Sequence, residues 1–117
     1  MPDRTARTPI TPPPGPALDA MIERAPEVAE LLRSIATPTR LLLLCRIAQG
    51  EPSVGELERD LGLRQPGLSQ QLAELRRSGL IAPRRESRAI HYSIADARVL
   101  ALLAAMHAIF CVEPTPD

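Results

Sequence analysis

The chain has 117 residues, enough for one domain with a modest hydrophobic core. Its 14 basic and 14 acidic residues cancel, so any surface that binds nucleic acid has to be local. With one Tyr, one Phe and no Trp, the composition disfavours a protein that stacks on single-stranded nucleic acid. No secretory or membrane-spanning segment is evident, which predicts a cytoplasmic protein with no membrane partner.

The N-terminal 17 residues predict a disordered or extended arm, because they hold six of the 13 prolines and almost no apolar periodicity. A folded domain is expected over residues 18–112, followed by a short tail, 113–117. The first helix is expected to begin near Leu18. Its apolar stripe has helical spacing and consists of Val28, Leu31, Leu32 and Ile35.

A second helix is predicted to follow directly. Thr37 suits its N-cap and Pro38 its first position, where the missing N–H of proline costs nothing. The helix should extend to Ala48. Its run of four leucines, residues 41–44, is too apolar for a surface helix and is expected in the core.

Residues 53–79 predict two more helices joined by a tight turn. Ser53 and a glutamate three residues later form a capping box at the start of the first. Gly62 suits the left-handed conformation that ends it, Pro66 the first turn of the next helix, and Gly79 the end of that helix. The second of the two has an apolar stripe of Leu68, Leu72 and Leu75. This arrangement is a helix-turn-helix, whose second helix can enter the DNA major groove.

The polar face of that second helix carries side chains that can contact DNA. Gln pairs with adenine edges, Ser with several bases, and Arg with guanine or phosphate. The candidate DNA contacts on this face are Gln65, Ser69, Gln70, Gln71, Arg76 and Arg77. Taken alone, the same face could equally be solvated and contact nothing.

Residues 80–94 predict two short strands around a basic tip. Ile90, Tyr92 and Ile94 alternate at the strand period, so one face of their strand is expected to pack inward. The tip adds three candidate contacts to phosphates or the minor groove, Arg84, Arg85 and Arg88. Residues 63–94 hold six Arg against two Glu, a local charge of +4 in a neutral chain. A basic hairpin directly after a recognition helix is the wing of a winged helix.

The last predicted helix begins after Asp96, which suits its N-cap. Its apolar residues are Val99, Leu100, Leu102, Leu103, Met106, Ile109 and Phe110. One small domain cannot cover so much apolar surface, which predicts a homodimer that uses this helix and the first one. The fold class is therefore mostly α: a homodimeric winged helix-turn-helix in the order α-α-α-α-β-β-α, with a two-stranded wing.

From about Val28 to Cys111 the chain resembles the ArsR/SmtB family of dimeric winged-helix repressors. The resemblance is carried by TPTR in the second helix, by SVGELERDLGLRQPGLSQQLAELRRSGLI, and by the RxxxxxHYSI end of the wing. It implies a transcriptional repressor that binds an inverted repeat in double-stranded operator DNA and releases it on binding an effector. An enzyme is not expected, since no Cys-x-x-Cys, Ser/His/Asp set or glycine-rich phosphate loop is present.

Metal-sensing members of the family carry their ligands in two places. In one of them this chain has ELERDL, without a cysteine. In the other, Asp96 is present, but Arg98 and Ile109 stand where further ligands are expected. A guanidinium repels a cation, so no metal site and no cofactor are predicted. A metal or general-oxidant effector stays the alternative reading.

Cys45 and Cys111 are the only thiols. Judged on spacing, both are typical of small buried hydrophobic residues, with Cys45 on a core face of its helix. The wording LLLLC and IFC, however, resembles the BigR/SqrR subgroup, which senses reactive sulfur species. This resemblance implies that persulfide or polysulfide joins Cys45 and Cys111 through a sulfur bridge, that the bridge abolishes operator binding, and that the regulated genes handle sulfide.

An alternative function of a different class also remains open: a winged helix that is used only for protein–protein contact.

Overall fold

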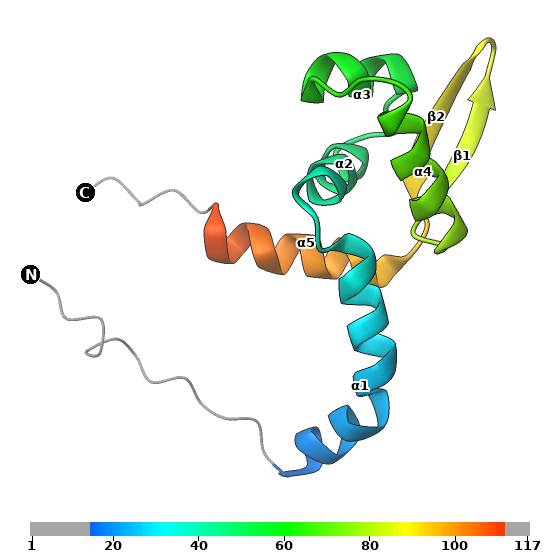
Figure 1. Cartoon of the computed structure of the whole chain (residues 1–117). Coiled ribbons are helices and arrows are strands. Elements are labelled where there is room, and N and C mark those ends of the chain that lie inside the picture. The colour runs from blue at the N-terminus through cyan, green and yellow to red at the C-terminus, as the bar shows by residue number, and fades with distance from the viewer. Residues whose placement is uncertain (1–14, 112–117) are drawn as a thin grey trace, which may run out of the picture. The chain divides into compact units, whose positions relative to one another are not determined.

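The structure, a computed structural model, describes residues 15–111 and divides the chain into two compact units, Met1–Arg33 and Ser34–Asp117. The described part of the first unit belongs to helix α1, Gly15–Ile35 (Figure 1). This helix begins three residues before the predicted start. The predicted N-terminal arm therefore lies outside the described residues except for its last three, and the predicted tail lies wholly outside them.

The second unit contains four helices and one antiparallel hairpin in its described part, in the predicted order (Figure 1). The winged helix-turn-helix fold is thereby confirmed. The elements are α2 (Pro38–Ala48), α3 (Val54–Leu61), α4 (Gly67–Arg77), β1 (Ile81–Glu86), β2 (Ala89–Ile94) and α5 (Ala97–Phe110).

Local chemistry sets the helix ends. The Thr37 hydroxyl accepts a hydrogen bond from the backbone N–H of Arg40 at 3.1 Å, and Pro38 is the first residue of α2. Ser53 forms the predicted capping box at α3, which ends at Gly62 with a left-handed φ of 66°. Pro66 directly precedes α4 instead of lying in its first turn.

The core of the second unit is built from the inward faces of all its helices and the start of β1. In α2, Leu43 and Leu44 are fully buried but Leu42 is 51% exposed, so only part of the leucine run lies in the core. Consecutive residues are 100° apart around a helix and cannot all face one side. The buried apolar side chains are Ile35, Leu43, Leu44, Ile47, Leu57, Leu68, Leu72, Leu75, Leu80, Ile81, Val99 and Leu103.

The wing is a two-stranded hairpin whose register pairs Ile81 with Ile94 and Glu86 with Ala89. Every residue of β2 is half-buried, so the predicted alternation between an inward and an open face is not observed. The reason is that helices α2, α3 and α5 all contact this strand. The backbone N–H of Tyr92 also donates to the Pro52 carbonyl at 3.1 Å, which ties the strand to the segment between α2 and α3.

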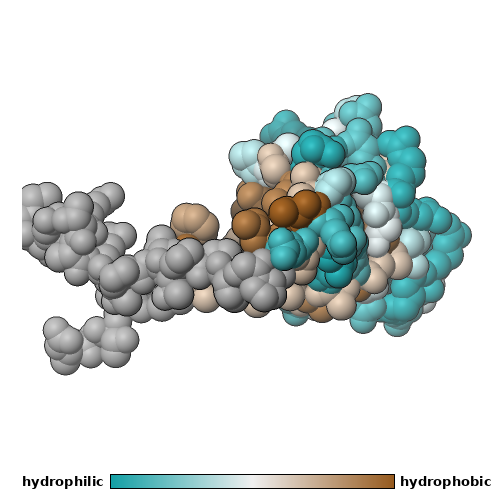
Figure 2. Space-filling view, turned by 90° about the horizontal axis from the view of Figure 1, so that it is seen from below, coloured by the Kyte–Doolittle hydropathy of each residue, from teal (hydrophilic) through white to brown (hydrophobic). Residues whose placement is uncertain are grey.

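Helix α5 covers only part of its apolar surface within its own unit. Val99 and Leu103 are buried, whereas Ile109 and Phe110 are 72% and 80% exposed. Figure 2 shows hydrophobic residues gathered in one area of the surface seen there. Within residues 15–111 no helix has the combination of length and hydropathy that a membrane span requires.

Candidate functional site

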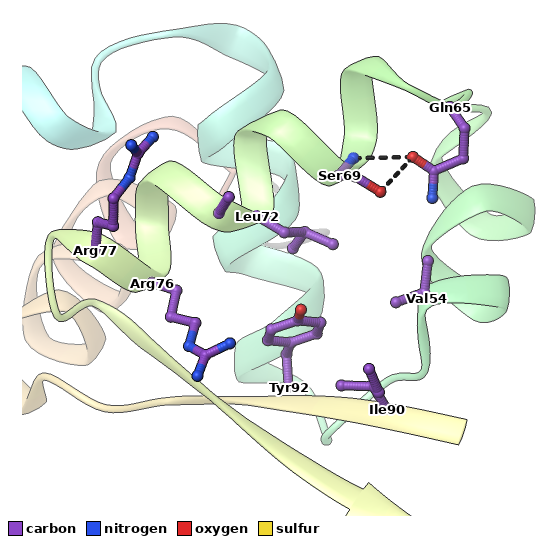
Figure 3. Close-up of a pocket in the computed structure, with 9 residues that line it drawn as sticks. Val54, Gln65, Ser69, Leu72, Arg76, Arg77, Ile90 and Tyr92 are labelled. Atoms are coloured by element: carbon purple, nitrogen blue, oxygen red, sulfur yellow. Dashed lines mark hydrogen bonds between the residues drawn. The ribbon is translucent and has the colours of Figure 1, made fainter. Parts of the chain in front are cut away.

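Helix α4 and strand β2 enclose a groove of about 570 Å³ on the polar side of α4 (Figure 3). Its floor is apolar and its rim carries amide, hydroxyl and guanidinium groups. Figure 3 shows Tyr92 pointing from β2 toward Leu72 of α4 and the side chain of Arg76 extending toward the tyrosine ring. The lining residues are Val54, Gln65, Ser69, Leu72, Ala73, Arg76, Arg77, Ile90 and Tyr92.

Gln65 organises the start of α4. Its Oε1 accepts from the backbone N–H of Ser69 at 3.0 Å and from the Ser69 hydroxyl at 2.6 Å (Figure 3). Gln65 thus acts as a cap from a position one residue before Pro66. Its NH2 group and the lone pairs of the Ser69 hydroxyl are the parts that stay available to DNA.

Gln71 does not lie on the open face of α4, contrary to the sequence prediction. It is half-buried, and its Oε1 accepts from Arg40 Nε of helix α2 at 2.8 Å. Glu74, one turn further along the same flank, pairs with the same guanidinium. Because Arg has donors only, the Gln71 carbonyl is the atom that is engaged, and its NH2 is left to donate.

The open face of α4 is therefore narrower than predicted. Gln70, Arg76 and Arg77 are exposed, and within the described residues none of their side chains forms a hydrogen bond or ion pair. Together with Ser69 they form the part of the helix that faces outward or toward the groove.

The three wing arginines differ from one another. Arg84 Nε donates to Glu51 Oε1 at 3.2 Å, and its other end pairs with Glu86. These hydrogen bonds, first to Glu86 and then to Glu51, raise the pKa of Arg84, and the bond from Arg84 lowers the pKa of Glu86. Arg85 and Arg88 are exposed and, within the described part of the chain, form no ion pair. Two free cations and one neutralised cation therefore face solvent at the wing.

Cys45 lies in α2 and Cys111 directly after α5, both in the second unit, and both are exposed. The interpretation as buried hydrophobic residues is therefore wrong, and Cys45 does not lie on the core face of α2. Cys111 directly follows α5, where its backbone N–H donates to the His107 carbonyl at 2.8 Å. Partial burial raises the pKa of Cys45, and the charge of Cys111 raises it further. Helices α2 and α5 pack against each other, so the two thiols belong to neighbouring elements of the fold.

The position expected for a metal ligand at the start of α5 is held by an ion pair. Arg98 Nη2 donates to Asp96 Oδ2 at 2.7 Å and Arg98 Nε lies 3.1 Å from Oδ1. Arg98 lowers the pKa of Asp96 accordingly. Residues 15–111 contain no group of three or more His, Cys, Asp or Glu side chains arranged to hold a metal ion.

A helix-turn-helix followed by a basic hairpin defines the winged-helix class of DNA-binding proteins. Residues 37–82 match the bacterial regulatory proteins of the arsR family. The biofilm growth-associated repressor of Agrobacterium fabrum is 53% identical over 94 residues, which are 80% of each chain. The chain therefore belongs to the arsR family, as its motifs predicted.

Solved structures agree with this assignment. The crystal structure of the transcriptional repressor BigR from Xylella fastidiosa has 45% identity and a TM-score of 0.78, over 82% of this chain and 98% of that one. The structure of reduced HlyU from Vibrio cholerae has 36% identity and a TM-score of 0.74, over 80% and 99%. All three relatives are transcriptional regulators, which confirms that the chain is not an enzyme.

Proposed function

We propose that this transcriptional repressor of the arsR family binds an inverted repeat in operator DNA as a homodimer and releases it when sulfur joins Cys45 to Cys111. The observation that carries the proposal is the pair of exposed thiols, one on α2 and one directly after α5, on two helices that pack against each other. The structure of HlyU is described in its reduced form, and the similarity to that protein supports a role for the thiol state.

The DNA-binding surface combines the open face of α4 with the free arginines of the wing. Ser69, Gln70 and the NH2 group of Gln65 would contact base edges. Arg76, Arg77, Arg85 and Arg88 would contact phosphates, which gives affinity that depends on salt.

The homodimer follows from the apolar surface that α5 leaves open. Leu100, Ile109 and Phe110 are 46%, 72% and 80% exposed, which is unusual for large apolar side chains of one helix. A two-fold dimer would place two recognition helices about 34 Å apart, one helical turn of DNA. The preferred binding site is then an inverted repeat.

The sulfur step needs no oxidant besides the effector. With an organic trisulfide R–S–S–S–R, one cysteine thiolate attacks the central sulfur and displaces RS⁻. The second thiolate attacks the same sulfur and displaces the other RS⁻, which leaves Cys–S–S–S–Cys and two thiolates in all. A direct disulfide needs Cα atoms within about 7 Å. Both thiols are exposed and therefore do not point into the contact between α2 and α5. An inserted sulfur lengthens the bridge and relaxes this requirement on the distance between the two cysteines.

Such a bridge would tie α2 to α5, the helix with the exposed apolar surface. It would change how α2 supports the reading helix and so switch the protein between two states. Genes for sulfide handling are the fitting targets, since their products would remove the effector.

The experiment starts from the preferred duplex selected out of a random library by the reduced protein. Its affinity is then measured after treatment with a polysulfide donor, with hydrogen peroxide or with Zn²⁺. We expect release by polysulfide, little effect of peroxide or zinc, and an intact mass that shows one crosslinked chain with added sulfur. Cys45→Ser and Cys111→Ser should bind DNA normally and not respond.

Other outcomes identify the alternatives. Release by zinc or peroxide alone would indicate a metal or general-oxidant effector. The absence of any preferred duplex would indicate a winged helix used for protein contact. A Cys111→Ser protein that still releases DNA on polysulfide addition would refute the dithiol mechanism.

A further inference from the structure

One guanidinium joins the helix that carries Cys45 to the helix proposed to read DNA. Arg40, in the first turn of α2, donates from Nε to Gln71 Oε1 at 2.8 Å and from Nη1 to the Ser34 carbonyl at 3.2 Å. Its third contact is the ion pair with Glu74. The Arg40 side chain is 20% exposed and that of Glu74 42%, so these bonds are partly shielded from water.

We propose that Arg40 is a positioning residue for operator recognition: it locks the rotation of α4 against α2 and transmits the state of the dithiol to α4. The transmission from the dithiol to α4 rests on the proposed function, whereas the positioning of α4 by Arg40 needs only that α4 reads DNA.

The geometry of the contact suits this role. Gln71 and Glu74 are three residues apart and lie on one flank of α4, while Ser69 and Arg76 line the groove on the other side. A planar guanidinium that grips two groups one turn apart restrains the helix from rolling about its axis. A lysine ammonium is a point charge without this fork and cannot hold both groups in a fixed direction.

The charge of Glu74 gives Arg40 a second effect. Glu74 is the only carboxylate in Gly67–Arg77. Unpaired, it would repel the phosphates that Arg76 and Arg77 attract. Arg40 supplies the compensating charge from outside α4, which leaves the DNA-facing side of the helix with net positive charge.

The link to the dithiol runs along α2. Arg40 and Cys45 are five residues apart, about 7.5 Å along the axis of one continuous helix. A bridge that pulls Cys45 toward Cys111 displaces α2 as a rigid element. The hydrogen bonds of Arg40 then either move α4 or break, and both outcomes change the orientation in which α4 meets DNA.

The test compares Arg40→Lys and Arg40→Met with Arg46→Lys. Arg46 is the matched control, because it lies on the same helix with the same 20% side-chain exposure but pairs with α3. The readout is the ratio of affinities for the selected duplex and for random DNA, measured on reduced protein. This ratio is insensitive to the folded fraction, which lowers both affinities together.

We expect Arg40→Lys to keep its affinity for random DNA. Its ratio of affinities for the selected duplex and for random DNA should fall roughly tenfold, which is the effect of losing one charge-assisted hydrogen bond. Arg40→Met should also weaken binding to random DNA, because it leaves the charge of Glu74 unpaired. Adding Glu74→Gln should restore the affinity for random DNA but not the ratio. Arg46→Lys should keep the ratio of the wild type. An unchanged ratio in Arg40→Lys, or an equal loss of the ratio in Arg46→Lys, would overturn the proposal. The comparison of these two variants decides the question even where Arg40→Met does not fold.

The transmission is tested on polysulfide-treated Arg40→Lys. The mass should show the same sulfur bridge as in the wild type, but the difference in operator affinity between the reduced and bridged forms should shrink. A bridged variant with the full wild-type response would refute transmission through Arg40. Should the wild type itself not respond to polysulfide, the sensing function fails, while the ratio on reduced protein still decides the role of Arg40 in recognition.

Discussion

Arg46 Nε donates a hydrogen bond to Oδ2 of Asp60 at 2.9 Å, which turns the cation next to Cys45 away toward α3. The carboxylate of Glu56 lies 3.5 Å from Arg46 Nη2 and adds to the neutralisation. The one positive charge adjacent to Cys45 in the sequence therefore does not favour its thiolate. Burial and the charge of Cys111 raise the pKa of Cys45 instead. At neutral pH Cys45 therefore has less thiolate than an ordinary exposed cysteine, and the reactivity has to come from the sulfur donor.

The raised pKa of Cys45 predicts how its alkylation depends on pH. Below its pKa the thiol is protonated and reacts slowly, so the rate for Cys45 in the folded chain should rise at a higher pH than in the urea-unfolded chain. In Cys111→Ser the neighbouring charge is absent and the midpoint should move down, part of the way toward the unfolded value. Iodoacetamide labelling followed by peptide mass spectrometry measures both midpoints. A Cys45 midpoint that is indifferent to Cys111→Ser would show that the thiols do not interact.

Helix ends were predictable where neighbouring residues decide the structure. The capping box at Ser53, the cap and proline that open α2, and the left-handed glycine after α3 all act within four residues. Such chemistry is present in the local sequence and does not depend on how the helices pack. The hairpin was also predicted, from the strand period of residues 90–94 and the basic tip, although the single inward face implied by that period is not observed.

Packing between distant segments was not predictable from one sequence. Arg40 and Gln71 are 31 residues apart, and nothing in their spacing indicates that one engages the other. Likewise, Leu44 is fully buried and Cys45 exposed although they are neighbours, because the phase of α2 against the core decides which side each faces. A sequence periodicity predicts which residues share one face of a helix. It does not predict, to within one residue, how far that face is turned toward the core.

The wing makes a prediction about salt. Arg85→Ala with Arg88→Ala should weaken binding to all duplexes and reduce the salt slope by roughly 0.9 for each phosphate that is no longer neutralised, since both cations are free. Arg84→Ala should do less, because Glu51 and Glu86 already neutralise that guanidinium. Affinity measured from low to moderate salt gives the slopes. Arg24→Ala, which removes an exposed arginine paired with Glu27 on α1, is the control. If Arg84→Ala reduced the affinity and the salt slope as much as the Arg85→Ala/Arg88→Ala double variant, Arg84 would contact phosphates as the two free arginines do.

The open face of α4 makes a prediction about specificity. Ser69→Ala and Gln70→Ala should each cost about 1–3 kcal/mol in binding to the selected duplex and much less on random DNA, as expected when a hydrogen bond to a base edge is removed. Ser69→Ala also removes the hydroxyl that Gln65 Oε1 accepts from, so Gln65→Ala should resemble it. Competition binding against random DNA measures the difference. A uniform loss on both kinds of DNA would place these side chains on phosphates and not on bases.

The capping box predicts a stability loss that depends on pH. Ser53→Ala should lower the free energy of unfolding by about 1 kcal/mol, the usual value for a lost N-cap. Hydrogen bonds from Ser53 lower the pKa of Glu56, so the contribution of ionised Glu56 is present above its unfolded pKa and lost as the pH falls through the folded pKa. The gap between wild type and Ser53→Ala should narrow over that acidic range. Urea titrations at several pH values measure it, with the exposed Ser78→Ala as control; a gap constant with pH would exclude Glu56 from the box.

The exposed side of α5 predicts how dimerisation can be broken without unfolding the protomer. From Val99 to Met106 this helix has no polar side chain, and Ala104 is exposed. Ala104→Glu places a carboxylate at the proposed interface twice, once from each subunit of a two-fold dimer. Burying an unpaired charge costs several kcal/mol, so the dimer dissociation constant should rise roughly a hundredfold or more.

Sedimentation velocity across a concentration series measures this constant, and thermal unfolding at low concentration checks the fold. Affinity for the inverted repeat should fall with dimerisation, while a single half-site is bound as before. Ala48→Glu, at an exposed alanine of α2, should change none of these quantities. A wild-type protein that sediments as a monomer at micromolar concentration in its reduced form would contradict the dimer itself, because the apolar side of α5 would then be stable in water without a partner.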